Sequence, residues 1–504
     1  MGTVDRAPEV ADVGAMAPVK SVAAGPPRRE EVKRHVLALL ESGALARGDR
    51  VPSIRELAGA VSAAKNTVIA ALDELCGEGV LEPRERSGFF VREGKRAPRA
   101  KRAELRDLEA DRLEHGLAVA LLGADTGAFV NLGSGCLPAR VAATEELKKL
   151  LRAPSRGPAV EYGFVDPQGD PRLRELVVAK RALGESRIDP EHVIITHGAN
   201  EGLNLACMEA AGASGCRRIA LESPGYFLLA PMLRHLSLEP VFVPRGPEGI
   251  DLDALVRERR RGGLAAFVTN PTHHNPLGTT LTLQERFALG SLAEREGMYL
   301  VEDDVFRGLS LERNEPATLR SLVPERTIYV SSFSKTLGAS FRIGFLVAPR
   351  GLVRGVRNRK FLWNLGEEVR SQRLLADFLE QRGYVRHVEQ VRAELARRAK
   401  LAAAQAKGFP DLGRLEPYRG GLFVRFLLRP GLRALALYES AKARRILISP
   451  GEFFQSDGRV APPPRTRRSH PERGGGWMRI SVGVCDGDVL RDSLRTLSEL
   501  VTDR

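Results

Sequence analysis

The segment Ser331-Ser332-Phe333-Ser334-Lys335 decides how the rest of this chain is interpreted. It follows the apolar run Thr327–Val330, which has the length of a buried strand, and Arg342-Ile343-Gly344 begins seven residues beyond the lysine. Similar short apolar runs recur, with helical patterns between most of them, at Val193–Thr196, Arg218–Leu221, Pro240–Val243, Ala265–Thr269, Tyr299–Glu302 and Gly344–Val347. This alternation predicts a mostly parallel sheet with helices on both faces.

In sheets of this kind, ligands bind at the carboxyl ends of the strands, and the chemically reactive segments of this chain lie at such ends. Gly198-Ala199-Asn200 would open a helix with free backbone amides, which suits a phosphate. Tyr226 follows the second run on a Pro-Gly turn, and Asn275 lies in the loop after the fourth. Glu302-Asp303-Asp304 ends the fifth run, where buried carboxylates need a cation or a proton. Taken singly, these features have ordinary structural explanations, such as packing for the tyrosine.

Lys335 among hydroxyl groups, together with a carboxylate and a phosphate loop, indicates the chemistry of pyridoxal 5′-phosphate. That cofactor needs an amine for its imine, an anion to keep its ring nitrogen protonated, and donors for its phosphate. A P-loop is excluded because no Gly-Lys-Ser/Thr follows a glycine turn. A zinc site at His273-His274 is excluded because adjacent histidines in an extended loop point apart and no glutamate-bearing helix supports them. We therefore expect no metal.

The N-terminal region has a different pattern, with three helical stretches followed by two short strands. These are expected at Val32–Leu40, from the capping box of Ser53 and Glu56, at Val68–Leu75, and at Leu81 and Phe89–Val91. Three helices and a β-hairpin predict a winged helix-turn-helix, whose third helix would enter the major groove of DNA.

The chain has 504 residues, which is too long for one compact core and predicts roughly two to four domains. Its 77 Lys and Arg against 63 Asp and Glu give a net charge of +14, which permits a polyanion as partner. The basic segment 92–102 lies beside the winged helix in sequence and would reinforce phosphate contacts. The Pro- and Arg-rich segment 459–473 is expected to be a surface loop, and the sequence assigns it no role.

Five scattered cysteines exclude a disulfide framework and a zinc cluster and are typical of the reducing cytoplasm. The N-terminal residues have no continuous apolar core of a signal peptide, and no apolar stretch approaches eighteen residues. We expect a cytoplasmic protein with no membrane partner.

The N-terminal region resembles the GntR family of winged-helix repressors. The matching motifs are Pro52–Ala58, Asn66-Thr67-Val68, Glu78–Leu81 and Gly88–Val91. The resemblance implies DNA contacts by Arg55, Lys65, Thr67 and Gly88. The family usually has Ser-Arg before Asn-Thr, whereas this chain has Ala64-Lys65. The loss of a cap and of a bidentate guanidinium weakens the expectation of sharp base readout but not that of DNA binding.

The rest of the chain, from about residue 130 to 500, resembles the fold type I aminotransferases, in the form fused to GntR winged helices that is known as MocR-type regulators. The matching motifs are Tyr162-Gly163, Gly169-Asp170, Leu173-Arg174, Gly198–Asn200, Pro224–Tyr226, Asn275–Gly278, Glu302–Asp304, Ser332–Lys335, Arg342–Gly344, Pro450-Gly451 and Arg479. The resemblance implies pyridoxal 5′-phosphate as cofactor and a dimer that shares residues around each cofactor.

Site roles follow from the matching positions. Lys335 would hold the cofactor as an imine, and Asp303 would pair with its ring nitrogen; these two are the expected catalytic residues. Asn275 would bind the phenolic oxygen and Tyr226 would stack on the ring. The phosphate would be held by Ala199, Asn200, Ser332, Ser334 and Arg342. Arg479 would clamp the α-carboxylate of an amino acid with a bidentate fork.

Two departures from the family pattern matter. A tyrosine usually follows the aspartate by two or three residues, but Val305 and Phe306 occupy those places here. The loss of one hydroxyl donor should alter the imine pKa and slow catalysis without abolishing imine formation. In addition, the stretch between Pro450-Gly451 and Arg479 is longer than the family needs.

The expected organisation is a disordered tail at 1–28, a GntR-type winged helix at 29–92, a basic and helical linker at 93–128, and an aminotransferase-like domain at 129–500. Within that domain, the large α/β part should span about 150–350 and a smaller C-terminal α+β part about 375–500.

Two functions fit these features. The first is a cytoplasmic, homodimeric transcription regulator that binds operator DNA and senses an amino compound or the cofactor itself through Lys335. The second is an active aminotransferase that moves an amino group between an amino acid and a 2-oxo acid, with an accessory winged helix. Retention of Lys335, Asp303, Asn275 and Arg479 leaves the second open.

Overall fold

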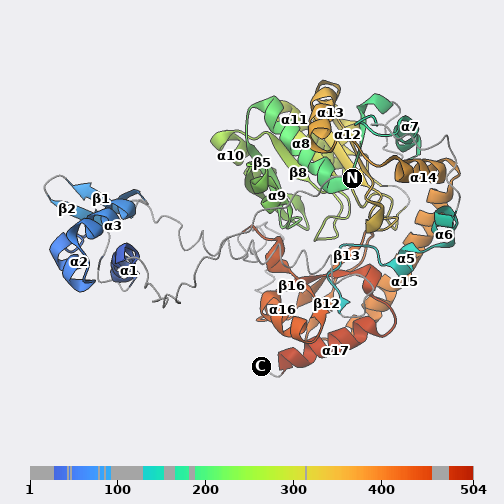
Figure 1. Cartoon of the computed structure of the whole chain (residues 1–504). Helices are drawn as coiled ribbons and strands as arrows, with labels where there is room; N and C mark the ends of the chain where they lie inside the picture. Colours follow the sequence, from blue (N-terminus) through green and yellow to red (C-terminus); the bar gives the residue numbers. More distant parts are fainter. Residues whose placement is uncertain are drawn as a thin grey trace, which may run out of the picture. The chain divides into compact units, whose positions relative to one another are not determined.

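The computed structural model describes residues 28–41, 45, 48–77, 80–84, 87–91, 129–152, 165–180, 188–312, 315–456 and 476–502. The chain divides into two compact units at residue 100, and each is described by itself (Figure 1). The expected tail up to residue 27, the basic segment 92–102, the linker 93–128, the Tyr162-Gly163 motif and the segment 459–473 lie outside the described residues.

The first unit is a winged helix, as predicted. Its elements are α1 (Arg28–Glu41), α2 (Ile54–Ala60), α3 (Lys65–Gly77), β1 (Leu81–Arg84) and β2 (Gly88–Val91). Val36, Leu57 and Leu72 are among the buried apolar residues that join the three helices to the hairpin. The capping box forms, with the Ser53 backbone N–H donating to Glu56 Oε2 at 2.7 Å and the Glu56 N–H to Ser53 Oγ at 3.3 Å.

A third extended segment, which the sequence did not predict, widens the hairpin of this unit. The backbone N–H groups of Gly48 and Val51 donate to Val91 O and Phe89 O at 3.0 and 2.9 Å, and the Val91 N–H donates to Asp49 O at 2.9 Å. The wing therefore rests on three paired segments rather than on an isolated hairpin, which makes it a firmer support for a nucleic-acid contact.

The second unit is built on an eight-stranded sheet in the order β4-β11-β10-β9-β8-β5-β6-β7. Its strands are β4 (Val193–Thr196), β5 (Arg218–Ser223), β6 (Glu239–Gly246), β7 (Gly249–Ile250), β8 (Ala266–Thr269), β9 (Tyr299–Asp303), β10 (Thr327–Ser332) and β11 (Gly344–Val347). The pairs from β10 through β6 are parallel, while β11 is antiparallel to both of its neighbours. The predicted mostly parallel sheet is confirmed.

Helices cover both faces of this sheet because alternate strand residues point to opposite sides. Ile194 of β4 packs in one core cluster together with residues of α8 (Ala199–Ser214), α9 (Leu229–His235) and α13 (Arg350–Asn364). Its neighbour Ile195 packs on the other face with α7 (Pro171–Lys180) and α14 (Val369–Glu380). On that second face, α10 (Leu252–Gly262), α11 (Leu283–Glu296) and α12 (Leu319–Leu322) enclose Ala220 of β5.

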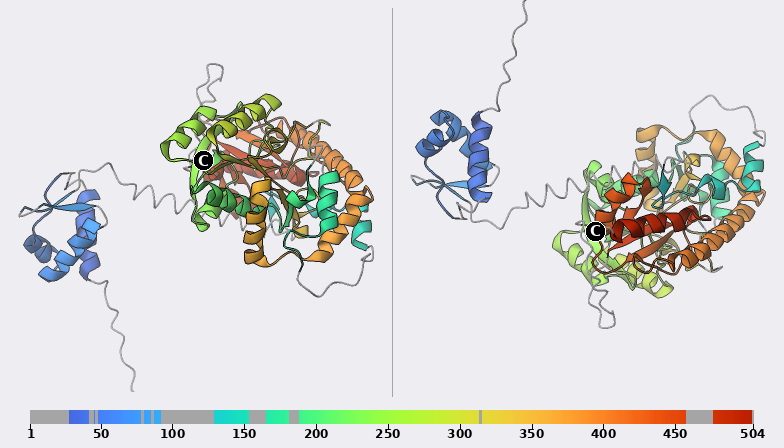
Figure 2. Two further views of the ribbon diagram at one scale, coloured as in Figure 1. Left: turned by 90° about the horizontal axis from the view of Figure 1, so that it is seen from above. Right: turned by 90° about the horizontal axis from the view of Figure 1, so that it is seen from below.

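The C-terminal part is a smaller α+β subdomain, also as predicted (Figures 1 and 2). Its antiparallel sheet has the order β12-β13-β16-β15. The elements are α15 (Gly383–Ala406), β12 (Gly413–Leu415), β13 (Phe423–Leu428), α16 (Ala434–Ala443), β14 (Ile446–Leu447), β15 (Ser449–Pro450), β16 (Trp477–Ser481) and α17 (Val489–Thr502).

The start of the second unit packs with this subdomain, although the two are far apart in sequence. β3 (Val130–Asn131) pairs in parallel with β14, and Val141 of α5 (Ala139–Ala142) lies in the subdomain core. The remaining helix before the sheet, α6 (Glu145–Arg152), contacts α15. Within the parts of the chain that the structure describes, no helix is long and apolar enough to cross a membrane.

Candidate active site and DNA-contact surface

Lys335 and Asp303 lie at the carboxyl ends of neighbouring parallel strands, β10 and β9. The Lys335 Nζ donates to the backbone carbonyl of Gly135 at 2.7 Å. Burial lowers the pKa of Lys335. Burial also raises the pKa of Asp303 to about 7, although the nearby Lys335 ammonium opposes this shift. The Asp303 Oδ1 is buried and has no hydrogen-bond partner among the described residues. A cationic N–H group would satisfy this oxygen.

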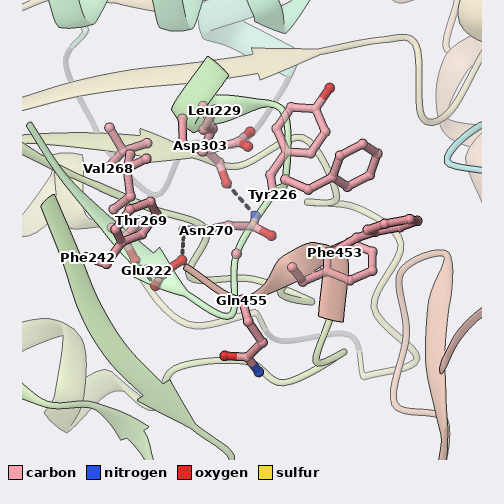
Figure 3. Close-up of a pocket in the computed structure, with 15 residues that line it drawn as sticks. Glu222, Tyr226, Leu229, Phe242, Val268, Thr269, Asn270, Asp303, Phe453 and Gln455 are labelled. Carbon is pink, nitrogen blue, oxygen red and sulfur yellow. Dashed lines mark hydrogen bonds between the residues drawn. The ribbon is translucent and has the colours of Figure 1, made fainter. Parts of the chain in front are cut away.

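Asn270 holds the backbone of two predicted site residues, although its place at a strand end is the one feature of the sequence that points to it. Its Nδ2 donates to Asp303 O at 2.6 Å (Figure 3), and its Oδ1 accepts from the Asn275 N–H at 2.7 Å. Both bonds are made to backbone atoms. Asn270 therefore holds the backbone of Asp303 and Asn275 in position and leaves their side chains available for other contacts.

Arg479 is a buried cation on β16 that is only 2% exposed. Its Nη1 donates to Asn275 Oδ1 at 2.6 Å and its Nη2 to Gly133 O at 2.6 Å. Its guanidinium lies over the rings of Phe423 and Phe454, 4.0 and 4.9 Å from their centres. Burial lowers its pKa to about 9. Among the described residues no carboxylate pairs with it, so this charge is held by neutral oxygens and aromatic faces alone.

The start of α8 and the end of β10 bring several hydrogen-bond donors together. Gly198 caps α8 with φ +76° and no side chain, so the first amides of the helix stay open. The Arg342 Nη2 donates to His197 O at 3.1 Å, and a Cβ on Gly198 would lie 2.7 Å from that Nη2. Ser332 Oγ donates to Ser334 Oγ at 3.0 Å.

Gly344 brings these elements together. A Cβ there would lie 2.9 Å from the backbone nitrogen of Ala199. Only glycine allows β11 to approach the first turn of α8 so closely. The structure thus gathers all five residues expected at the phosphate, namely Ala199, Asn200, Ser332, Ser334 and Arg342.

Tyr226 lies close both to Asn200 at the start of α8 and to Asp303 at the end of β9. Burial raises the pKa of its hydroxyl, which accepts a hydrogen bond from Asn200, and the Asp303 carboxylate is close enough to raise this pKa further. A small cavity of about 20 Å³ lies between Tyr226, Asp303 and Phe453 (Figure 3).

Glu222 lines this cavity and forms a buried charged layer together with Arg245 and His274. It contacts Arg245 and accepts from Thr269 Oγ1 at 2.7 Å and from the Asn270 N–H at 3.0 Å. Burial alone would raise the pKa of Glu222, but Arg245 and His274 outweigh burial and hold this pKa below its usual range. The layer therefore fixes the loop that carries Asn270.

The expectation of an extended loop at His273-His274 is wrong. His273 is in the left-handed region, with φ +49°, and His274 Nε2 turns back to within 3.1 Å of Glu222 Oε2. The described residues include no group of three or more His, Cys, Asp or Glu side chains that could hold a metal ion. Phe306, which stands where a tyrosine is usual, is 2% exposed and packs edge-on against Phe423 with ring centres 5.4 Å apart.

The expected DNA contacts lie on the first unit. Arg55 on α2 and Lys65 at the start of α3 are exposed, and Thr67 is half-buried in the first turn of α3. Gly88 is exposed at the tip of the wing with φ +99°. No acidic residue lies in the first turn of α3, so its open amides and Lys65 present positive charge together.

Comparisons with known proteins bear on both units. The model of the aminotransferase class I and II family matches residues 129–489, more than half of the chain, and that of the GntR family of bacterial regulatory proteins matches residues 28–91. Among curated proteins, the HTH-type transcriptional regulator YisV of Bacillus subtilis is 24% identical over 86% of this chain and 90% of its own length. The pyridoxine biosynthesis transcriptional regulator PdxR of Corynebacterium glutamicum is 28% identical over 78% of this chain and 81% of its own length.

Solved structures share the fold of the second unit. LysN, the α-aminoadipate aminotransferase of Thermus thermophilus, has a TM-score of 0.64 at 24% identity and covers 75% of this chain and 92% of its own. The kynurenine aminotransferase of Pyrococcus horikoshii has a TM-score of 0.63 at 21% identity. It covers 82% of this chain and 95% of its own. The chain therefore belongs to the aminotransferase class I and II family and carries a GntR-family DNA-binding domain at its N-terminal side.

Proposed function

We propose that this protein is a cytoplasmic, homodimeric transcription regulator. It binds operator DNA through the winged helix and senses an amino compound through pyridoxal 5′-phosphate held at Lys335. YisV and PdxR, which are both named as HTH-type transcriptional regulators and match most of the chain, support the regulatory role. Two winged helices on one dimer would read a repeated half-site.

The observation that carries this proposal is the set of unsatisfied charges in the site. Arg479 is buried without a described carboxylate, and Asp303 has a buried oxygen without a partner. Buried charges of this kind destabilise a fold unless a ligand of opposite charge completes them. A carboxylate-bearing amine with a cationic ring beneath it would satisfy both.

The described residues fit the cofactor. Lys335 would hold it, Asp303 would pair with its ring nitrogen, and Tyr226 would lie against its ring. Asn275 Oδ1 is used by Arg479, which leaves its Nδ2 to donate to the phenolic oxygen. The phosphate would lie at the start of α8, against Ala199, Asn200, Ser332, Ser334 and Arg342. When bound, the cofactor supplies an electrophilic carbon and an electron sink that amino acid side chains lack.

Each of these residues has a task that its surroundings support. A lowered pKa keeps more of the Lys335 amine neutral, and therefore nucleophilic, at pH 7. Asp303 would be held ionised beside a cationic ring N–H, since an adjacent cation lowers the pKa of a carboxyl group. Arg479 orients the ligand through its carboxylate with a planar fork.

A DNA-binding titration tests this function. Genomic DNA fragments that bind the protein are first selected. The affinity of the protein for these fragments is then measured with cofactor alone and with cofactor plus each amino acid of a panel. We expect one or more amino acids to change the affinity of the parent and of Lys407→Ala, an exposed control. Lys335→Ala should bind the same DNA without responding. A response that survives Lys335→Ala, or no DNA binding at all, would refute the proposal.

A second function, turnover as an aminotransferase, is favoured by one observation. Asn275 and Arg479 are in direct contact at 2.6 Å, so the groups assigned to cofactor and carboxylate are already assembled as one unit. Mixing with an amino acid and then a 2-oxo acid tests it. Repeated cycles at about 1–10³ per second would support an enzyme, and a single half-reaction would support a sensor.

A further inference from the structure

A short segment near the start of the second unit contacts the candidate site. Residues 132–136, here called the strap, follow β3 directly. In sequence, β3 is preceded by residues 92–128, which join the GntR domain to this unit. The strap is therefore the part of the site closest along the chain to the DNA-binding domain.

Two carbonyl groups of the strap contact the two cations of the site. Gly135 O accepts from Lys335 Nζ at 2.7 Å, and Gly133 O accepts from Arg479 Nη2 at 2.6 Å. These are the groups to which the proposed function assigns the cofactor and the carboxylate of the ligand. A neutral carbonyl is a weaker acceptor for a cation than a carboxylate, so both contacts can be exchanged for better ones.

The two ends of the strap are held differently. The Gly133 N–H donates to Leu447 O at 3.2 Å, and a Cβ on Gly133 would lie 2.2 Å from Ser449 Oγ, so this end is wedged against the subdomain. A Cβ on Gly135 would meet nothing within 4 Å, so this end has room to move. Around Gly135, the Cys136 N–H donates to Ser134 Oγ at 3.2 Å and closes a turn.

We propose that the strap is an internal ligand of the site and that a bound amino compound displaces it. A carboxylate that docks on Nη2 of Arg479 competes with Gly133 O for the N–H groups of that nitrogen, while Nη1 stays with Asn275 Oδ1. The cofactor, when joined to Lys335, would leave that nitrogen with at most one N–H in place of three, which weakens its bond to Gly135 O. Site occupancy is thereby converted into release of the strap, which follows β3 directly. This inference rests on the proposed function and deepens it by naming the element that responds to the ligand.

Hydrogen exchange followed by mass spectrometry on the full chain tests the displacement. The amides of Gly133, Ser134 and Cys136 report the strap, since they donate within it or to its neighbours at 3.2–3.3 Å. With pyridoxal 5′-phosphate and then an amino acid bound, we expect exchange in the peptide over residues 129–137 to quicken by about tenfold or more, the effect of losing one hydrogen bond to a charged group. Exchange in β13 should not change.

Two variants distinguish specific release of the strap from a general loosening of the fold. In the absence of any ligand, Lys335→Ala removes the contact of Gly135 O and should quicken strap exchange, whereas Lys407→Ala should not. Visible absorbance of bound cofactor is recorded on the same samples. Cofactor that binds while the strap exchanges as slowly as in the ligand-free protein overturns this inference and leaves the proposed function standing. Absence of that absorbance refutes the proposed function itself.

Discussion

Asp303→Asn is expected to stabilise the cofactor-free protein as the pH rises. Burial raises the pKa of Asp303 from 3.8 to about 7, and its Oδ1 has no partner among the described residues. The folded protein therefore binds this proton more tightly than the unfolded chain does. The free energy of unfolding must fall as pH rises from about 4 to about 7, and it levels off above the raised pKa. Asparagine has nearly the same shape and no charge to bury.

The magnitude follows from the shift. A change of about three pKa units at about 1.4 kcal/mol each gives a total cost on the order of 4 kcal/mol above pH 7. Between pH 5.5 and pH 8.5, the advantage of Asp303→Asn over the parent should therefore grow by about 2 kcal/mol, nearly all of it below pH 7.5. Cofactor binding should weaken in the same variant, because the ring nitrogen loses its anion.

Urea unfolding followed by tryptophan fluorescence measures this. Both tryptophans, Trp363 and Trp477, lie in the second unit, so the signal reports that unit alone. Asp304→Asn is the matched control. Burial would raise the pKa of Asp304, but Arg307 and Arg286 outweigh burial and lower this pKa, so its loss should destabilise throughout this range. Parallel pH curves for the parent and Asp303→Asn would refute the reasoning.

Three further predictions concern other parts of the chain. Replacing Arg55 and Lys65 by alanine should weaken DNA binding and reduce the slope of log affinity against log salt by about 2; parent-like binding would show that these contacts are misassigned. Ser53→Ala removes the capping box and should lower the stability of the winged helix by about 1 kcal/mol in thermal unfolding, and an unchanged transition would contradict this. Gly198→Ala should weaken cofactor binding about tenfold in a calorimetric titration. Gly215→Ala, with a similar positive φ but nothing within 4 Å of an added Cβ, should not weaken that binding.

Much of the fold could be predicted because its signals are local. The sequence at Val193–Thr196 and Gly344–Val347 predicts strands that the structure places at those same bounds. The winged helix could be predicted because the capping box of Ser53 and Glu56 lies within one turn. The convergence of Lys335 and Asp303 follows from topology, since parallel strands end at one edge of a sheet.

The features that the sequence did not predict depend on contacts between residues far apart in the chain, or on backbone atoms. Gly135 lies 200 residues from Lys335, and its contact uses a carbonyl that every residue type carries. Asn270 acts through the backbone of Asp303 and Asn275, so its side chain shows no catalytic pattern. The pairing of β3 with β14 joins two short segments that have no signal of their own. Such contacts come from tertiary packing and not from local periodicity.

The most direct test of the account is to find which residue binds the cofactor. The full chain is incubated with pyridoxal 5′-phosphate, reduced with borohydride, digested and mapped by mass spectrometry. We expect the label on Lys335 at close to one per chain and none on exposed lysines such as Lys149 and Lys407. A label spread over surface lysines, or a Lys335 peptide that stays unmodified while cofactor is in excess, would contradict the central claim.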